Sequence, residues 1–143
     1  MDKYDSIKLE NQLCFPLYAL SREIIKLYKP ILDKYNLTYT QYIAMLVMWE
    51  KEKITFKDLG KKLHLDSGTL TPVLKKLEAM ELIIKYRTKE DDRVVMVEIT
   101  EKGKALKDDI LEVPKEMLCK SVIDMDEVSE LKAMLDKFLK RFE

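Results

Sequence analysis

One stretch in the middle of the chain constrains the fold most, because its periodicity changes abruptly from helical to strand-like. Residues 55–63 read as a short amphipathic helix with Thr55 as its N-cap and Asp58 at its third position. A turn over 64–68 leads into a second helix that extends to about Met80. The apolar residues of this second helix are spaced for one inner face and comprise Leu70, Val73, Leu74 and Leu77. Two short helices joined by such a turn form a helix-turn-helix pattern.

Two segments rich in branched residues, 82–87 and 94–99, follow the second helix and are predicted strands. The charged stretch 88–93 between them is predicted to form a hairpin. A helix-turn-helix followed by a hairpin is a winged helix. We therefore predict a mainly α fold with a small β-hairpin wing, in which about residues 53–99 form a DNA-binding unit.

Further helices are predicted on both sides of this unit. The N-terminal one must begin near Leu13, because Pro16 is tolerated only in a first turn. Its apolar stripe, at spacings of three and four residues, comprises Leu13, Leu17, Leu20, Ile24, Leu27 and Ile31. A second helix over 39–50 is apolar on nearly every side and is therefore expected to be buried, and two more helices are predicted over 101–120 and 126–142.

Heptad-like apolar seams mark the helices at both ends of the chain, about 7–36 and 101–143. These seams either pack on the core of the chain's own domain or interlock between two copies. We favour a homodimer, because it would place two reading helices on one face of a DNA duplex. The whole chain, 1–143, is then one winged-helix domain with dimerisation helices.

The overall charge is neutral, with 26 basic and 26 acidic residues, which argues mildly against nucleic-acid binding. Between Lys51 and Arg93, however, basic residues outnumber acidic ones, so the electrostatic footprint on DNA is expected to be local to the predicted DNA-binding unit. The N-terminus lacks the basic-then-apolar pattern of a secretion signal, and the longest apolar run, 43–49, is too short to span a bilayer. We expect a cytoplasmic protein without membrane contact.

The start of the second helix in the helix-turn-helix has the small polar residues that let a helix enter the major groove. The candidate base-reading residues are Ser67, Thr69 and Thr71, and Lys75 and Lys76 suit phosphates. The wing ends in Arg93, whose planar guanidinium group could enter a narrow minor groove. We expect Asp91 or Asp92 to clamp Arg93 or the wing turn. Taken alone, the segment 67–71 could equally be a helix cap with a polar face.

Several strings resemble one family, the multiple-antibiotic-resistance regulators (MarR), and within it the organic hydroperoxide resistance repressors (OhrR). The most specific strings are NQLCF at 11–15 and LDSGTLTP at 65–72, and the resemblance extends over nearly the whole chain. It implies a homodimeric repressor, not an enzyme, that binds a pseudo-palindromic operator on double-stranded DNA. It also implies release of that operator when an organic hydroperoxide oxidises the N-terminal cysteine.

Carried over by resemblance, Cys14 matches the peroxide-reactive cysteine of the family. Tyr28 and Tyr39 match two tyrosines that reach this cysteine from the other subunit, and Tyr18 matches a nearby pocket residue. Pro16 departs from the small or aliphatic residue expected there, which bears on the shape of the pocket.

Peroxides react with a thiolate rather than a thiol, so Cys14 needs surroundings that favour its anion. A helix N-terminus and donated tyrosine hydroxyls would both do so. The apolar neighbours of Cys14, Phe15 among them, suit a hydroperoxide with an apolar tail. With His64 as the single histidine, we expect no metal site and no cofactor.

Cys119 has three interpretations. By resemblance it is the resolving cysteine that forms a disulfide with Cys14 of the partner, which we favour. In the second, Cys14 reacts with a small thiol, and in the third Cys119 is a buried inert thiol. Neither cysteine belongs to a secreted-type disulfide framework.

Three other functions compete with this interpretation. A regulator of the same fold could respond to a small aromatic or phenolic ligand, with Cys14 incidental. A thiol peroxidase is disfavoured, because the chain has no Cys-x-x-Cys motif and no thioredoxin-like βαβ order. A dimeric adaptor could bind proteins through the helical seams.

Overall fold

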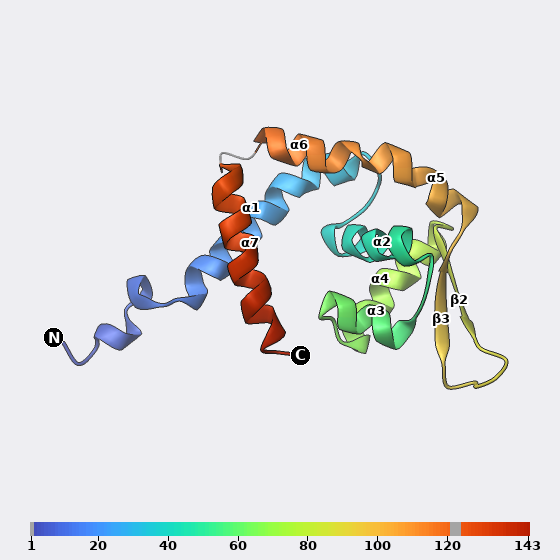
Figure 1. Cartoon of the computed structure of the whole chain (residues 1–143), viewed down its shortest axis with the longest axis horizontal. Helices are drawn as coiled ribbons and strands as arrows, with labels where there is room; N and C mark the ends of the chain where they lie inside the picture. The colour runs from blue at the N-terminus through green and yellow to red at the C-terminus, as the bar shows by residue number, and fades with distance from the viewer. Residues whose placement is uncertain (1, 121–123) are drawn as a thin grey trace.

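The computed structural model describes residues 2–120 and 124–143. Figure 1 shows the helix-turn-helix and the sheet gathered in one body, with α1, α6 and α7 beside it and α5 connecting the two. The elements in chain order are the 3-10 turns η1 (Asp5–Ile7) and η2 (Leu9–Asn11), then α1 (Cys14–Asp33), α2 (Tyr39–Lys51), β1 (Lys53–Thr55), α3 (Phe56–Leu63), α4 (Ser67–Ala79), β2 (Ile83–Arg87), β3 (Val95–Ile99), α5 (Glu101–Ile110), α6 (Glu112–Lys120) and α7 (Met125–Lys140). The predicted mainly α fold with a β wing is confirmed.

The cap predicted for the first helix of the helix-turn-helix is present, and the second helix has a cap as well. Thr55 Oγ1 accepts a hydrogen bond from the Asp58 backbone N–H at 3.0 Å, which fixes the start of α3. His64 ends α3 in the left-handed conformation (φ 55°). Asp66 then caps α4 by accepting from the Thr69 backbone N–H at 2.7 Å. The predicted inner face of α4 is buried, at Leu70, Val73, Leu74 and Leu77.

The sheet has three antiparallel strands in the order β1-β3-β2. β2 and β3 form the predicted hairpin, with Ile83 opposite Ile99 and Arg87 opposite Val95. β1 was not predicted, because three residues are too few for an alternating pattern. This strand exists because Glu52, at φ 63°, turns the chain out of α2 and its carbonyl accepts from the Ile99 N–H at 2.9 Å.

α2 forms much of the core, with Met45 and Met48 fully buried. The expectation that the whole apolar segment is buried was wrong at Leu46, which is 42% exposed. The far end of α2 is joined to α5 by a buried hydrogen bond, in which Trp49 Nε1 donates to the Gly103 carbonyl at 2.8 Å. This bond ties the winged helix to the C-terminal helices.

The single helix predicted over 101–120 is two helices, α5 and α6, separated at Leu111. Pro114 explains the break, because it has no N–H to donate to the Ile110 carbonyl and its ring crowds that carbonyl. α7 starts close to the predicted position and is capped by Asp124, which accepts from the Asp126 N–H at 2.9 Å.

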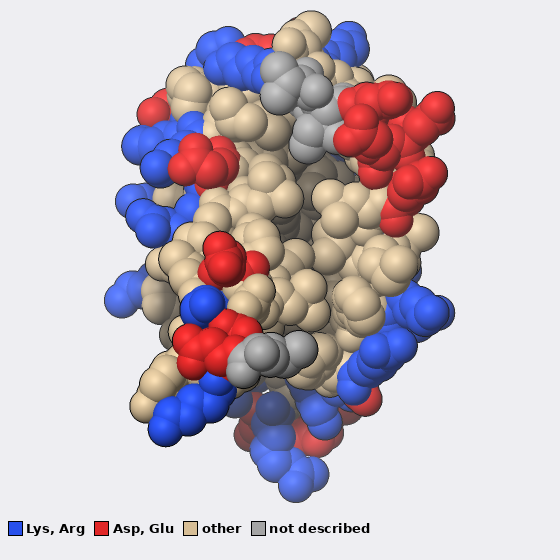
Figure 2. All heavy atoms as spheres, turned by 90° about the vertical axis from the view of Figure 1, so that its left-hand side faces the viewer, with Lys and Arg blue, Asp and Glu red and all other residues tan. Residues whose placement is uncertain are grey.

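α1 begins at Cys14 with Pro16 in its first turn, as predicted. Only Ile31 and Leu32 of α1 are buried, and the described residues of α7 include no buried one. The seams of both helices are therefore largely exposed in the single chain, and the homodimer stays a prediction. Figure 2 shows this face, where a broad uncharged area runs down the middle, with a few acidic side chains set into it left of centre and most charged residues toward the edges. Within the described residues, no helix is both long and apolar enough to cross a bilayer.

Candidate functional site

Cys14 is the first residue of α1, and its side chain is exposed. Leu13, at the N-cap position, has no side-chain acceptor, and within the described residues no side-chain hydrogen bond caps this helix end. The first turn also contains no acidic residue. The N–H groups at the positive end of the helix dipole therefore have no side-chain acceptor beside the sulfur.

Three tyrosines form a cluster where α1 crosses α2. The ring of Tyr28 lies 4.9 Å from that of Tyr39 in an edge-to-face arrangement and 5.8 Å from that of Tyr42. The rings of Tyr39 and Tyr42 are 6.3 Å apart. Tyr42 was not predicted, although a tyrosine three residues after Tyr39 on the same helix face was a usable signal.

Burial sets the protonation of this cluster. Burial, with smaller contributions from the two neighbouring phenols, raises the pKa of Tyr28 to about 12. Burial also raises the pKa of Tyr39 and of Tyr42. All three side chains are therefore neutral phenols at physiological pH and able to donate hydrogen bonds to an anion.

Within one chain, the structure does not bring Cys14 and the tyrosine cluster together. Cys14 and Tyr28 stand at the two ends of a stretch of α1 that rises about 21 Å. Tyr18, four residues after Cys14, lies one turn away on the same helix face. Tyr18 is exposed and accepts a hydrogen bond from Arg22 Nη1 at 3.5 Å, and Phe15 is exposed in the same first turns.

An apolar cavity of about 280 Å³ lies beside the tyrosine cluster. Tyr28 and Tyr39 line it together with Ile25, Leu32 and Leu37. A second cavity of about 310 Å³, between α1 and α7, shares Ile25 and Tyr39 with the first. An apolar path therefore extends from the phenols along α1.

Cys119 is exposed on α6, so its interpretation as a buried thiol is wrong for the single chain. α6 packs on the C-terminal part of α1, where Lys34 Nζ lies 2.8 Å from Glu116 Oε1. Lys34 is about 30 Å along the helix direction from Cys14. The two cysteines of one chain are thus kept well apart.

The predicted reading residues lie on one exposed face of α4. Its exposed side chains include Ser67, Thr69, Thr71, Lys75 and Lys76. The Thr71 hydroxyl donates to the Ser67 carbonyl at 2.7 Å, which orients it at the start of the helix. Hydrogen bonds from Thr69 lower the pKa of Asp66, so this cap stays ionised at neutral pH.

Arg93 stands at the tip of the wing with its side chain 91% exposed. Asp91 Oδ1 accepts from the Arg93 backbone N–H at 3.0 Å and from Nε at 3.1 Å. This contact confirms that one of the two aspartates clamps the arginine, and it lowers the pKa of Asp91. Asp92 acts differently, because its carbonyl accepts from Arg87 Nη1 at 2.6 Å and closes the turn.

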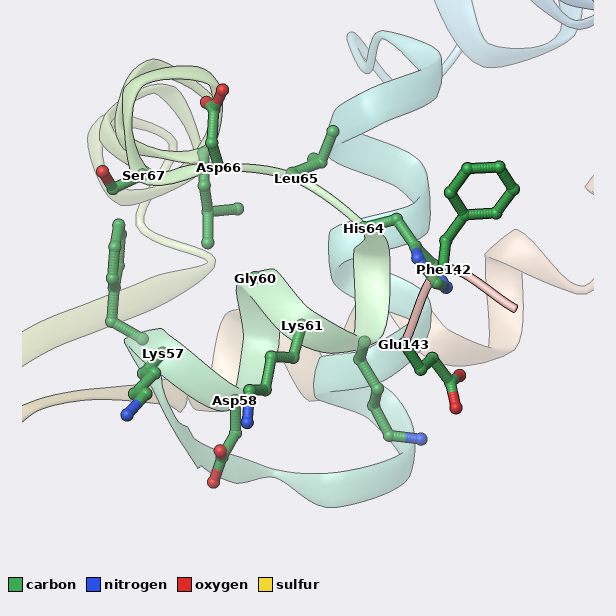
Figure 3. A pocket seen from close by; sticks show the side chains of 13 residues that line it. Lys57, Asp58, Gly60, Lys61, His64, Leu65, Asp66, Ser67, Phe142 and Glu143 are labelled. Atoms are coloured by element: carbon green, nitrogen blue, oxygen red, sulfur yellow. The ribbon is translucent and has the colours of Figure 1, made fainter. Parts of the chain in front are cut away.

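A cavity of about 980 Å³ lies between α3, the helix-turn-helix turn and the end of the chain. Figure 3 shows Phe142 beside His64 at one edge, with Lys57 and Lys61 on α3 at another. No feature of the sequence pointed to this cavity. It does not adjoin Cys14 or the tyrosine cluster, whose cavities are lined by other residues.

Comparison with known proteins agrees with this arrangement. The family model of SarA/Rot transcriptional regulators matches residues 26–110. The organic hydroperoxide resistance transcriptional regulator of Bacillus subtilis is 49% identical over 134 residues, which cover 94% of this chain and 91% of the relative. The chain belongs to the MarR family, in its organic hydroperoxide resistance branch. The predicted resemblance is confirmed, and this MarR-family chain is a winged-helix transcriptional regulator.

Two further comparisons extend the MarR-family assignment. The regulator SarZ of Staphylococcus aureus is 40% identical, and the match covers 93% of this chain and 90% of SarZ. AbfR of Staphylococcus epidermidis, solved in its reduced form on DNA, superposes with a TM-score of 0.83 at 29% identity over 99% of this chain and 96% of AbfR. AbfR has also been solved overoxidised on DNA and in a disulfide form.

Proposed function

We propose that this chain is a dimeric, redox-sensing repressor that releases its operator when an organic hydroperoxide oxidises Cys14. One observation carries the proposal. The exposed Cys14 lies at an uncapped helix N-terminus, while the neutral phenols suited to bind its thiolate lie about 21 Å away on the same helix. A second copy related by a two-fold axis would bring its tyrosines to Cys14 of this chain. The same axis would bring this chain's tyrosines to Cys14 of the second copy.

The chemistry follows from this arrangement. The Cys14 thiolate attacks one peroxide oxygen, so that an S–O bond forms and the O–O bond breaks. The leaving alkoxide takes a proton and departs as an alcohol, and Cys14 becomes a sulfenic acid. A neutral sulfenic acid accepts hydrogen bonds from the phenols less strongly than the thiolate anion does. The contacts between the two copies then change, and with them the spacing of the two α4 helices.

The experiment that tests the proposal is a titration of the reduced protein bound to its own promoter DNA. We expect a single equivalent of cumene hydroperoxide to release the DNA, with a mass increase on the Cys14 peptide, and dithiothreitol to restore binding. Release by a substituted phenol, with no effect of hydroperoxide, would instead support the regulator of small aromatic ligands. The cavity beside Tyr28 and Tyr39 is near the lower size limit for such a ligand.

Cys119 is expected to resolve the sulfenic acid between two copies. Its thiolate attacks the Cys14 sulfur of the partner, so that an S–S bond forms, the S–O bond breaks and hydroxide leaves to become water. The exposure of both thiols and their separation within one chain support this route, as does the disulfide form of AbfR. After one equivalent of hydroperoxide, the wild type should run as a covalent dimer in non-reducing electrophoresis.

Two variants control that experiment. Cys14→Ser should give no covalent dimer, because no sulfenic acid forms. Cys119→Ser should stay monomeric on the gel and accumulate sulfenic or sulfinic acid at Cys14 instead. A Cys119→Ser band that shifts as strongly as wild type would exclude Cys119 as the resolving cysteine.

The nucleic-acid interface is proposed to be the exposed face of α4 together with the wing. Arg93→Ala should lower operator affinity about tenfold, because the planar guanidinium group at the wing tip is lost. Fluorescence anisotropy with labelled promoter DNA measures this. Arg22→Ala, which removes the same charge from α1, is the matched control and should bind within about twofold of wild type. Equal losses in both variants would mean that only net charge matters.

A further inference from the structure

Glu78 departs from a local rule of helix stability. It lies in the last turn of α4, which ends at Ala79, and its side chain is exposed. The carbonyl groups at a helix C-terminus carry partial negative charge, so a carboxylate there is unfavourable, and lysine or arginine is preferred. Departures from local rules are expected at positions that serve a function, so the contact that Glu78 makes is informative.

Lys85, in β2, directs its backbone N–H away from the sheet. β2 lies at the edge of the sheet, in the strand order β1-β3-β2. Before Lys85, the Leu82 carbonyl accepts a hydrogen bond from the Thr100 N–H at 3.1 Å. After it, the Thr88 N–H donates to the Val94 carbonyl at 3.0 Å. Because the bonds to one neighbour alternate along an antiparallel strand, even-numbered residues face β3 and the Lys85 N–H points to the outer edge.

Glu78 supplies the acceptor for this edge N–H. Its Oε2 accepts the hydrogen bond from the Lys85 backbone N–H at 3.3 Å. An N–H at a sheet edge has no strand to donate to, so its acceptor must come from outside the sheet. Here the acceptor comes from α4, which carries the predicted base-reading residues, while β2 leads to Arg93 at the tip of the wing. One hydrogen bond therefore joins the two elements that are proposed to contact DNA.

The hairpin is braced between Lys85 and its tip. The Tyr86 hydroxyl donates to Glu98 Oε1 at 3.1 Å and so links β2 to β3. Nearer the tip, the Thr88 hydroxyl donates to the Asp91 carbonyl at 2.7 Å. Figure 1 shows this hairpin extending away from the helices. Five strand residues rise about 17 Å, so a tilt of roughly 10° at Lys85 would move the tip by about 3 Å. Such a shift is as long as a hydrogen bond and would break a contact at the tip.

We propose that Glu78 is a positioning residue that fixes the orientation of the wing relative to α4, so that α4 and Arg93 contact the operator as one rigid unit. The proposal rests on the proposed function, which assigns the nucleic-acid interface to α4 and the wing. Glu78 acts through geometry and against its own charge, because a carboxylate in the DNA-binding unit repels phosphates. Its contribution to binding is therefore opposite in sign to the one that electrostatics predicts.

Glu78→Ala tests this sign in the full-length reduced protein. We expect operator affinity to fall about fivefold in fluorescence anisotropy, because the wing is no longer held at Lys85. Loss of the negative charge alone would tighten binding, and alanine would make the end of α4 more stable. An affinity equal to or above that of wild type would therefore overturn the proposal.

Two control variants separate the hydrogen bond from the charge. Glu78→Gln keeps a side-chain carbonyl oxygen that can accept from the Lys85 N–H, so it should bind within about twofold of wild type. Glu81→Ala removes the same charge three residues further along and leaves the Glu78 contact in place. It should bind at least as tightly as wild type. A loss in Glu78→Gln as large as in Glu78→Ala would contradict the role of Glu78 as an acceptor.

Hydrogen exchange of the Lys85 amide, followed by NMR without DNA, reports the contact itself. Exchange should be about tenfold faster in Glu78→Ala and unchanged in Glu78→Gln, because only the alanine variant lacks an acceptor. A double variant then links the contact to the wing tip. In an Arg93→Ala background, Glu78→Ala should lower affinity by less than about twofold, since the group that it positions is gone. A fivefold loss in both backgrounds would show that Glu78 does not act through Arg93 and would overturn the proposal.

The outcomes separate this proposal from the proposed function. If Arg93→Ala binds weakly but Glu78→Ala binds as wild type does, the wing contacts DNA without help from Glu78, and only the positioning role fails. If Arg93→Ala itself binds as tightly as wild type, the proposed interface at the wing fails. The positioning role of Glu78 then fails with it, even where the Lys85 amide is protected.

Discussion

Cys14→Ser is expected to bind the operator within about twofold of wild type, because a hydroxyl replaces a thiol of similar size at an exposed site. It should lose the response to hydroperoxide completely. Wild type is expected to leave the DNA at one equivalent of cumene hydroperoxide. The variant should still be bound at about a hundred equivalents, since no thiolate is present to attack the peroxide. Anisotropy of a labelled promoter fragment, with and without oxidant, measures both quantities.

Cys119→Ser is the control for this loss, because it removes one thiol and leaves Cys14 in place. It should still respond to the first equivalent, although reversal by dithiothreitol becomes incomplete as Cys14 oxidises further. DNA release from Cys14→Ser at the wild-type dose would refute Cys14 as the sensor. It would direct attention to the methionines or to a ligand cavity instead.

The fold was predictable where a local rule decided it. The Thr55 cap and the apolar periodicity of α4 indicated the helix-turn-helix before any tertiary contact was known. Two features were not predicted. β1 needs a partner strand to exist, and the break between α5 and α6 depends on Pro114, whose effect on the preceding turn was overlooked.

The candidate site was predictable residue by residue but not as an assembly. Resemblance identified Cys14, Tyr28 and Tyr39, and the structure then placed the sulfur far along α1 from both phenols. Periodicity cannot reveal which residues of a second copy complete a site, because it describes a single helix face. Tyr42, which packs on the two named tyrosines, was predictable from helical spacing, because it lies three residues after Tyr39 on the same helix face.

The contact between the winged helix and the C-terminal helices should be the position where a substitution destabilises the fold most. Gly103 lies where α5 meets the body, and its carbonyl accepts the hydrogen bond from Trp49 Nε1. A Cβ at this position would lie 2.4 Å from the Leu82 carbonyl oxygen and 2.7 Å from Ile99 Cγ1. The first of these is a backbone atom, so neither a rotamer change nor a small side-chain shift relieves the clash.

Gly103→Ala is therefore expected to lower the free energy of unfolding by about 3 kcal/mol, the upper range for overpacking. The melting temperature, measured by circular dichroism at fixed protein concentration, should fall by roughly 10 °C. Gly68→Ala is the matched control, because its Cβ would approach nothing closer than Asp66 Oδ1 at 3.6 Å. That variant should be as stable as wild type or gain up to about 1 kcal/mol from the better helix propensity of alanine. If both variants have the same melting temperature, the close approach at Gly103 does not fix α5 on the winged helix. Movement of the C-terminal helices would then not be transmitted through Trp49 to α4.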